Sequence, residues 1–166
     1  FSEIAPHFTM KRMLNDYKSN FYDKLLARTA EIKKEDYLLA RRVAKWKLKM
    51  ISNWDKIEVL DVNVPDPSIS PLKLGELFEA EVILLIPEIS CQDIGVEALF
   101  GQKENGDVKN ILWVKEMKMK KLEDNRVSCR CSFNMDRAGG YDYIFRIYPK
   151  SDLVPHKQSL RLVKWI

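Results

Sequence analysis

The chain has 166 residues, of which 46% are apolar and 31% are charged, with 6 glycines and 7 prolines. This composition is typical of a globular protein and excludes a disordered or fibrous chain. No apolar run approaches the roughly 20 residues of a membrane span, and the chain does not open with a signal peptide. We therefore expect a cytoplasmic protein without a membrane partner.

Basic residues concentrate in the first third of the chain. Residues 1–56 carry 13 Lys and Arg against 7 Asp and Glu, a net charge of +6, whereas residues 57–166 carry 15 against 17, a net charge of −2. A basic helical region can indicate nucleic-acid binding, but no recognition motif accompanies it here. We therefore expect no nucleic-acid partner.

Residues 1–55 are predicted to form a helical pair. Thr9 is a suitable N-cap, and the apolar residues after it recur at helical spacing, at Met10, Met13, Leu14, Tyr17, Phe21 and Leu25. A second helix is predicted from Lys34 or Asp36 to Asn53, with an apolar side at Leu39, Val43, Trp46, Met50, Ile51 and Trp54. The polar stretch TAEIKKED, residues 29–36, is expected to join the two helices.

Residues 56–166 are predicted to form a separate β-domain, because apolar residues alternate there with period two. The expected strands are 56–64, 76–86, 94–101, 126–133, 141–149 and 160–166, with 110–123 as one long strand or two broken ones. Seven or eight short strands indicate an antiparallel sandwich resembling the immunoglobulin type. The predicted fold class is therefore α+β.

The alternation also predicts which side chains face the core of the β-domain. In RVSCRCSF the residues Val127, Cys129, Cys131 and Phe133 face one way, and Tyr141, Tyr143, Phe145 and Ile147 are expected to face inward from the strand that follows. Three cysteines, including Cys91, do not make a disulfide framework, and no His or Cys cluster has metal-ligand spacing. We expect buried free thiols and no metal site.

The usual catalytic motifs are absent from the sequence. It contains no glycine-rich phosphate loop, no G-x-S-x-G elbow and no H-E-x-x-H. His7 and His156 are the only histidines, and neither has an identifiable catalytic partner. Glu79 and Glu81 share one face of a strand and could act as a carboxylate pair, but solvent-exposed strand faces commonly carry such pairs. Trp113, with Tyr141 and Tyr143, could stack on sugar rings, although aromatic residues at period two are more often core.

One short stretch resembles a known enzyme family. In FTMKRMLNDY the residues Phe8, Thr9, Arg12, Leu14 and Tyr17 match F-[ST]-x-x-R-x-[IL]-x-x-Y, the closing segment of the alpha-glucan phosphorylases. A bacterial and archaeal branch of that family continues with a second helix similar to LARRVAKWKLKMISNWDKIEVLDV and then an all-β extension. The stretches DIGVEALFG, AGGYDYIFRIYPK and LRLVKW resemble the strands of that extension, so the resemblance covers essentially the whole chain.

This resemblance implies a role within a larger enzyme. Phosphorylases of glycogen, starch and maltodextrin move glucosyl units between the end of a glucan and phosphate, forming glucose 1-phosphate, with pyridoxal phosphate held on a lysine. Neither the motif around that lysine nor the groups that hold the substrate phosphate occur in these 166 residues. We therefore expect no catalytic, cofactor-binding or metal-binding residue in the segment, with pyridoxal phosphate in the parent enzyme.

The role of the segment itself has several interpretations. Because the chain starts at Phe1 rather than Met, we interpret it as a C-terminal fragment whose first helix packs on the catalytic domain of the parent phosphorylase. The β-domain is interpreted first as a structural buttress or homo-oligomer contact, and second as an accessory module that binds alpha-glucan through Trp113. An isolated binding module of another pathway is a third interpretation.

Overall fold

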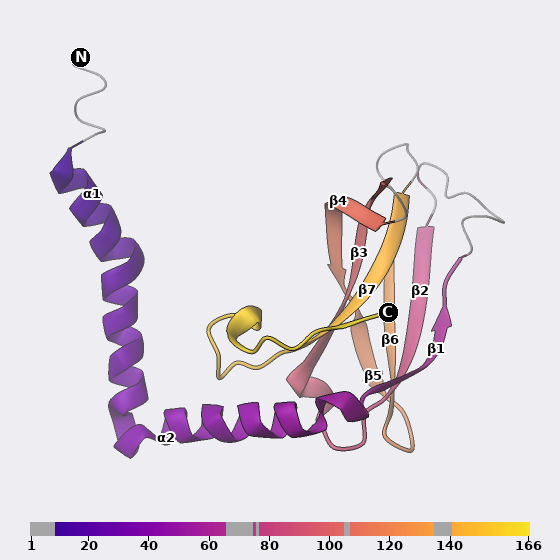
Figure 1. Cartoon of the computed structure of the whole chain (residues 1–166), viewed down its shortest axis with the longest axis horizontal. Helices are drawn as coiled ribbons and strands as arrows, with labels where there is room; N and C mark the ends of the chain where they lie inside the picture. Colours follow the sequence, from indigo (N-terminus) through magenta and orange to yellow (C-terminus); the bar gives the residue numbers. More distant parts are fainter. Residues whose placement is uncertain (1–8, 66–74, 76, 105–106, 135–140) are drawn as a thin grey trace, which may run out of the picture. The chain divides into compact units, whose positions relative to one another are not determined.

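The computed structural model describes residues 9–65, 75, 77–104, 107–134 and 141–166, without the side chains of residues 102–109 (Figure 1). It divides into two compact units, Phe1–Trp46 and Lys47–Ile166, which we treat separately. His7 and the family-like residue Phe8 lie outside the described residues. The main architecture is a long N-terminal helical segment followed by two four-stranded antiparallel sheets packed as a sandwich.

The helical segment starts where the sequence predicts. Helix α1, Met10–Tyr17, is capped by Thr9, whose Oγ1 accepts a hydrogen bond from the backbone N of Arg12 at 3.2 Å. A π-helical turn, η2 (Lys18–Tyr22), then leads into helix α2, Asp23–Asn53. The turn η3, Trp54–Lys56, ends the segment just before the first strand.

The break between the two predicted helices lies later than expected. Helical backbone continues through residues 29–33, which were predicted to be a polar junction, so that expectation is wrong for this stretch. Lys34 to Tyr37 have non-helical dihedrals inside α2, with Glu35, Asp36 and Tyr37 at φ 50, 51 and 62°. Lys, Glu and Ala all favour helix, which explains why the first helix extends across the polar residues.

The sandwich consists of eight strands within the described part of the chain. They are β1 (Glu58–Asn63), β2 (Leu77–Leu85), β3 (Ile94–Glu104), β4 (Asp107–Glu116), β5 (Lys118–Lys121), β6 (Arg126–Asn134), β7 (Tyr141–Pro149) and β8 (Lys164–Trp165). One sheet has the order β1-β2-β6-β5 and the other β4-β3-β7-β8, and every recorded pairing is antiparallel. We call them sheet A and sheet B.

Aromatic and aliphatic side chains from both sheets form the core. Phe78 of sheet A meets Phe100 of sheet B edge-to-face, with ring centroids 5.0 Å apart, and Phe133 lies 4.2 Å from Phe100. Cys129, Cys131, Phe145 and Ile147 are buried and Phe133 and Tyr143 are half-buried, which confirms the predicted inward face.

Two details of the strands differ from the simple alternating pattern. The stretch 110–123 is two strands, and the chain passes from sheet B to sheet A at Met117, which is buried and donates its N–H to Val96 O at 2.8 Å. The last strand is only two residues long, although Ile166 extends it by exchanging backbone hydrogen bonds with Phe145 at 3.0 and 3.2 Å.

Candidate functional site

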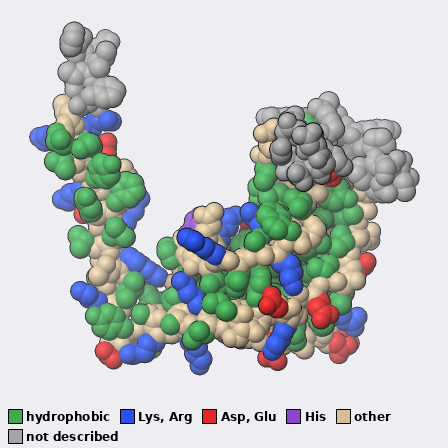
Figure 2. Space-filling view, viewed as in Figure 1, with side chains coloured by type: hydrophobic (Ala, Val, Ile, Leu, Met, Phe, Trp, Pro, Cys, Tyr) green, Lys and Arg blue, Asp and Glu red, His purple; other side chains and the backbone are tan. Residues whose placement is uncertain are grey.

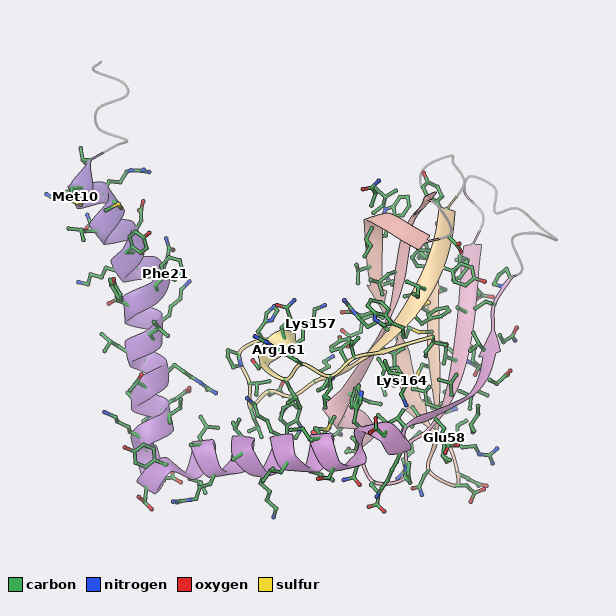
Figure 3. All side chains as sticks on the ribbon, viewed as in Figure 1. Met10, Phe21, Glu58, Lys157, Arg161 and Lys164 are labelled. Carbon is green, nitrogen blue, oxygen red and sulfur yellow. The ribbon has the colours of Figure 1, made fainter. Side chains whose placement is uncertain are left out.

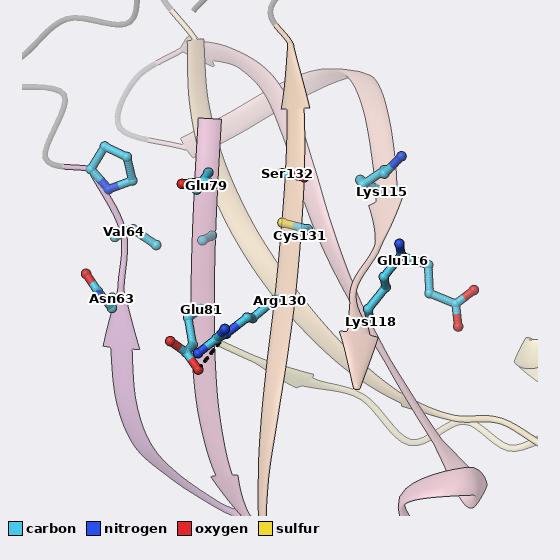
Figure 4. Close-up of a pocket in the computed structure, with 12 residues that line it drawn as sticks. Asn63, Val64, Glu79, Glu81, Lys115, Glu116, Lys118, Arg130, Cys131 and Ser132 are labelled. Atoms are coloured by element: carbon cyan, nitrogen blue, oxygen red, sulfur yellow. Dashed lines mark ion pairs between the residues drawn. The ribbon is translucent and has the colours of Figure 1, made fainter. Parts of the chain in front are cut away.

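A polar groove lies on the outer side of sheet A, and β4 of sheet B contributes Lys115 and Glu116 to its lining (Figure 4). Glu79 and Glu81 alternate along β2 with the buried residues Phe78, Ala80 and Val82, so their side chains point away from the core. The groove has a volume of about 760 Å³. It is lined by Asn63, Val64, Pro65, Glu79, Ala80, Glu81, Lys115, Glu116, Lys118, Arg130, Cys131 and Ser132.

A row of directly opposed polar residues crosses the floor of the groove. Asn63 on β1 pairs with Glu81 on β2, Glu81 pairs with Arg130 on β6, and Arg130 pairs with Lys118 on β5. Because neighbouring strands lie about 4.8 Å apart, this row spans about 14 Å. Strand register thus brings together one amide, one carboxylate and two cations from four separate parts of the sequence.

Two hydrogen bonds fix the carboxylate at the centre of this row. Oε1 of Glu81 accepts from Arg130 Nε at 2.9 Å and from the hydroxyl of Ser128 at 2.6 Å. The Arg130 hydrogen bond, followed by that of Ser128, lowers the pKa of Glu81, and Glu81 in turn raises the pKa of Arg130. Ser128 is only 4% exposed, so its hydroxyl acts as an internal support for the groove.

The sandwich also contains a charged cluster outside the groove, on the outer side of sheet B. Glu97 is 5% exposed and is bound by Arg146 and by Lys157, whose Nζ lies 2.7 Å from Oε1. Burial alone would raise the pKa of Glu97, but the hydrogen bonds from Arg146 and Lys157 outweigh it, and the pKa is lowered. Lys157 lies 5.2 Å from the centre of the Tyr148 ring, so this cluster attaches the C-terminal segment to the sheet.

Trp113, the residue singled out from the sequence, does not line the groove. It opposes the buried Phe100 across the β3–β4 pair and is half-buried. Its ring centroid lies 5.1 Å from that of Tyr141, edge-to-face, and 6.4 Å from that of Phe133. These contacts place Trp113 in the aromatic packing between the sheets, and a sugar-stacking role for it stays a prediction.

The other sequence candidates separate into different environments. Glu81 belongs to the polar row, and Glu79 lies one pair further along the same face, opposite Ser132. Nδ1 of His156 accepts from the backbone N of Gln158 at 3.1 Å, so this imidazole caps the short turn Lys157–Ser159. Arg130 and Lys118 could not be identified from the sequence, because only the strand register shows that Arg130 lies opposite Glu81 and Lys118 opposite Arg130.

The described side chains do not fit pyridoxal phosphate. A lysine that forms a Schiff base needs a desolvated pocket, whereas every described lysine is exposed or half-exposed. Lys164 is one of the two half-exposed lysines, and it donates to the backbone O of Ile57 at 2.5 Å. Within the same residues, no group of three His, Cys, Asp or Glu side chains is arranged to hold a metal ion.

Among the residues with described structure, no helix is both long enough and apolar enough to cross a bilayer. Helix α1 is strongly amphipathic, and residues 1–56 are rich in Lys and Arg.

These features define the class of the protein: an α+β module in which a helical segment precedes an antiparallel two-sheet sandwich. The family described as "Glycogen phosphorylase C-terminal domain" matches residues 54–166, and the chain belongs to this family. The resemblance seen in the sequence is thereby confirmed.

Two curated relatives extend the similarity over nearly the whole chain. A maltodextrin phosphorylase of Thermococcus litoralis is 32% identical over 98% of this chain, and a glycogen phosphorylase of Mycobacterium bovis is 22% identical over 96% of it. The aligned parts are 19% and 18% of those proteins, so the chain spans about a fifth of the length of these relatives. No solved structure matches the chain.

Proposed function

We propose that this chain is the non-catalytic C-terminal part of an alpha-1,4-glucan phosphorylase. Membership of the C-terminal domain family and the similarity to a maltodextrin and a glycogen phosphorylase support this proposal. The parent enzyme would release glucose 1-phosphate from glycogen or maltodextrin in the cytoplasm, with pyridoxal phosphate bound outside this segment. The strand order of the two four-stranded sheets, which the chain connects at Met117, is consistent with an immunoglobulin-type sandwich.

The segment's first role in this proposal is to dock on the catalytic part of the enzyme. The observation that carries it is an apolar stripe on residues 10–26, which we call the helical stripe (Figures 2 and 3). Its large side chains are 43–68% exposed: Met10, Met13, Leu14, Tyr17, Phe21, Tyr22, Leu25 and Leu26. Such a stripe is typical of a surface that another protein part covers.

The size of the stripe favours a macromolecular partner. Full burial of Met13, Tyr17, Phe21 and Leu25 would contribute about 1.5–3 kcal/mol each, or about 6–12 kcal/mol together as an upper bound. Tyr17 and Phe21 already lie with ring centroids 5.7 Å apart, which forms a compact aromatic centre for the contact. In the isolated chain, the same stripe would pair with that of a second copy across a two-fold axis.

Hydrogen exchange tests the docking role. We expect the amides of residues 10–26 to exchange slowly in the full-length gene product and rapidly in a dilute solution of the 166-residue chain. Phe21→Asp should restore fast exchange in the full-length protein, whereas Lys24→Asp, a charge change beside the stripe, should not. Equal exchange of these amides in both proteins would contradict docking.

An accessory glucan-binding surface is the second candidate function. The observation that favours it is the polar groove on sheet A, whose side chains suit a hydroxyl-rich ligand better than the half-buried Trp113 does. The two roles are compatible, because the groove lies in the unit Lys47–Ile166 and the stripe lies in the unit Phe1–Trp46.

A further inference from the structure

We propose that the groove on sheet A is a binding site for an uncharged oligosaccharide, with Glu81 and Arg130 as its central hydrogen-bonding pair. This inference rests on the glucan-binding candidate above and names its site. It does not depend on the docking role of the helical stripe.

The central pair is held in place before any ligand binds. Glu81 uses Oε1 for both of its hydrogen bonds, to Ser128 and to Nε of Arg130. Among the described residues, no further hydrogen bond engages Oε2 of Glu81 or the two terminal nitrogens of Arg130. The side chain of Arg130 is 71% exposed and that of Glu81 is 25% exposed, so both ends of the pair face the groove.

Oε2 of Glu81, a hydrogen-bond acceptor, thus lies next to the two terminal nitrogens of Arg130, which are donors. A sugar hydroxyl both donates and accepts a hydrogen bond, so two adjacent hydroxyls can donate to Glu81 and accept from Arg130 at once. Asn63 and Lys118 continue the row on either side, and Ser132 lies one pair away. A ligand with hydroxyls along its length can therefore meet successive polar groups across the sheet.

The charge of the groove restricts the class of ligand. Its cations are Lys115, Lys118 and Arg130, and its carboxylates are Glu79, Glu81 and Glu116. Glu81 pairs with Arg130 inside the groove, whereas Glu116 pairs with Lys150, which is not a lining residue, so the groove contains charges of both signs. The carboxylates of the groove would repel a polyanion, and its lysines and arginine would repel a polycation. A neutral ligand with many hydroxyls avoids these repulsions.

The lining also explains why the expected affinity is modest. None of the described residues that line the groove is aromatic, so among them a sugar ring meets no π-face on which to stack. Among the described lining residues, Val64 and Pro65 are apolar, whereas the side chains of Ala80 and Cys131 are buried in the core. Binding then depends on hydrogen bonds, and we expect weak binding that a long glucan with many repeats strengthens by multivalency.

A titration of the 166-residue chain with maltoheptaose, followed by backbone amide chemical shifts, locates the site. We expect the largest shifts on β2, β5 and β6 around Glu81, Lys118 and Arg130. Arg130→Ala should weaken binding about tenfold or more, because it removes charge-assisted hydrogen bonds. Ser128→Ala should weaken it less, because Ser128 only positions Glu81.

Arg126→Ala is the matched control. Arg126 lies on the same strand and is paired with Asp124 at 3.4 Å, outside the groove, so its loss should leave the affinity within about twofold. The proposal is overturned if maltoheptaose causes no shifts at millimolar concentration, if the shifts centre on Trp113, or if the two arginine variants weaken binding equally. The shift map of the unaltered chain decides the site even if a variant fails to fold.

Discussion

Replacing Glu97 by glutamine should destabilise the sandwich far more than the same change at Glu116. The two carboxylates oppose each other directly across β3 and β4, and each is paired with at least one cation. Glu97 is 5% exposed and is held by Arg146 and Lys157, whereas Glu116 and its partner Lys150 are both about half exposed. The pair of variants therefore isolates the effect of burial on an ion pair.

The magnitude follows from the exposure of each partner. Hydrogen bonds to charged groups contribute about 1.5–3 kcal/mol, and the side chain of Arg146 is 25% exposed while that of Lys157 is 40% exposed. Discounting the Lys157 bond for solvent screening, we expect Glu97→Gln to cost about 2 kcal/mol. Glu116→Gln should cost about 0–1 kcal/mol, as exposed pairs do.

Urea unfolding at several pH values measures both costs. The pKa of Glu97 is lowered in the folded protein, so near pH 4 the unfolded chain binds more protons than the folded one. The ionised carboxylate therefore stabilises the fold above the unfolded pKa of about 4.3. The difference between the unaltered chain and Glu97→Gln should thus be constant from about pH 6 to 8 and shrink as the pH falls below about 4. Equal costs for the two variants, or a difference that grows in acid, would refute the reasoning.

Two further predictions concern the core. Burial raises the pKa of Cys129 to about 12 and that of Cys131 to about 11. A thiolate-selective reagent at pH 8 should therefore label both cysteines only after denaturant is added, with the half-buried Cys91 as the internal reference. Rapid labelling of both in the native protein would contradict their inward position. A Cβ at Gly95 would lie 2.4 Å from Cζ of Tyr148, so Gly95→Ala should cost about 1–3 kcal/mol in urea unfolding. Tyr148→Ala should relieve part of that cost in the double variant, and strictly additive costs would argue against the clash.

The β-domain was largely predictable because its strands have one buried face. In β6 the residues Val127, Cys129 and Cys131 are buried while Arg126 and Arg130 are exposed, as the alternation requires. A shift of one residue would bury both arginines, so the core itself fixes the register. Ser128 departs from this pattern, because its outward hydroxyl is covered and bonded to Glu81.

Features that depend on more than one strand could not be predicted. The passage from sheet B to sheet A at Met117 leaves almost no mark in NILWVKEMKMKKLE, because apolar and charged residues occur on both sides of Met117 without a Gly or Pro to mark a break. The polar row of the groove needs residues 63, 81, 118 and 130 in register. The sequence marks Trp113 as an aromatic residue that could stack on a sugar ring. It does not show that Phe133 and Tyr141, which are distant in sequence, contact the Trp113 ring.

The two sheets offer unequal opportunities for binding a ligand. On sheet B, the outward residues Glu97 and Leu99 are buried, and Lys157 of the C-terminal segment reaches Glu97, so this region is occupied by the chain itself. On sheet A, the described residues leave a groove on the outward face, in which Glu81 and Arg130 hold each other. A ligand on sheet B would compete with Arg146 and Lys157 for Glu97, whereas a ligand on sheet A could bind the Glu81–Arg130 pair without breaking it. This difference, more than any single residue, favours sheet A as the ligand-binding side of the sandwich.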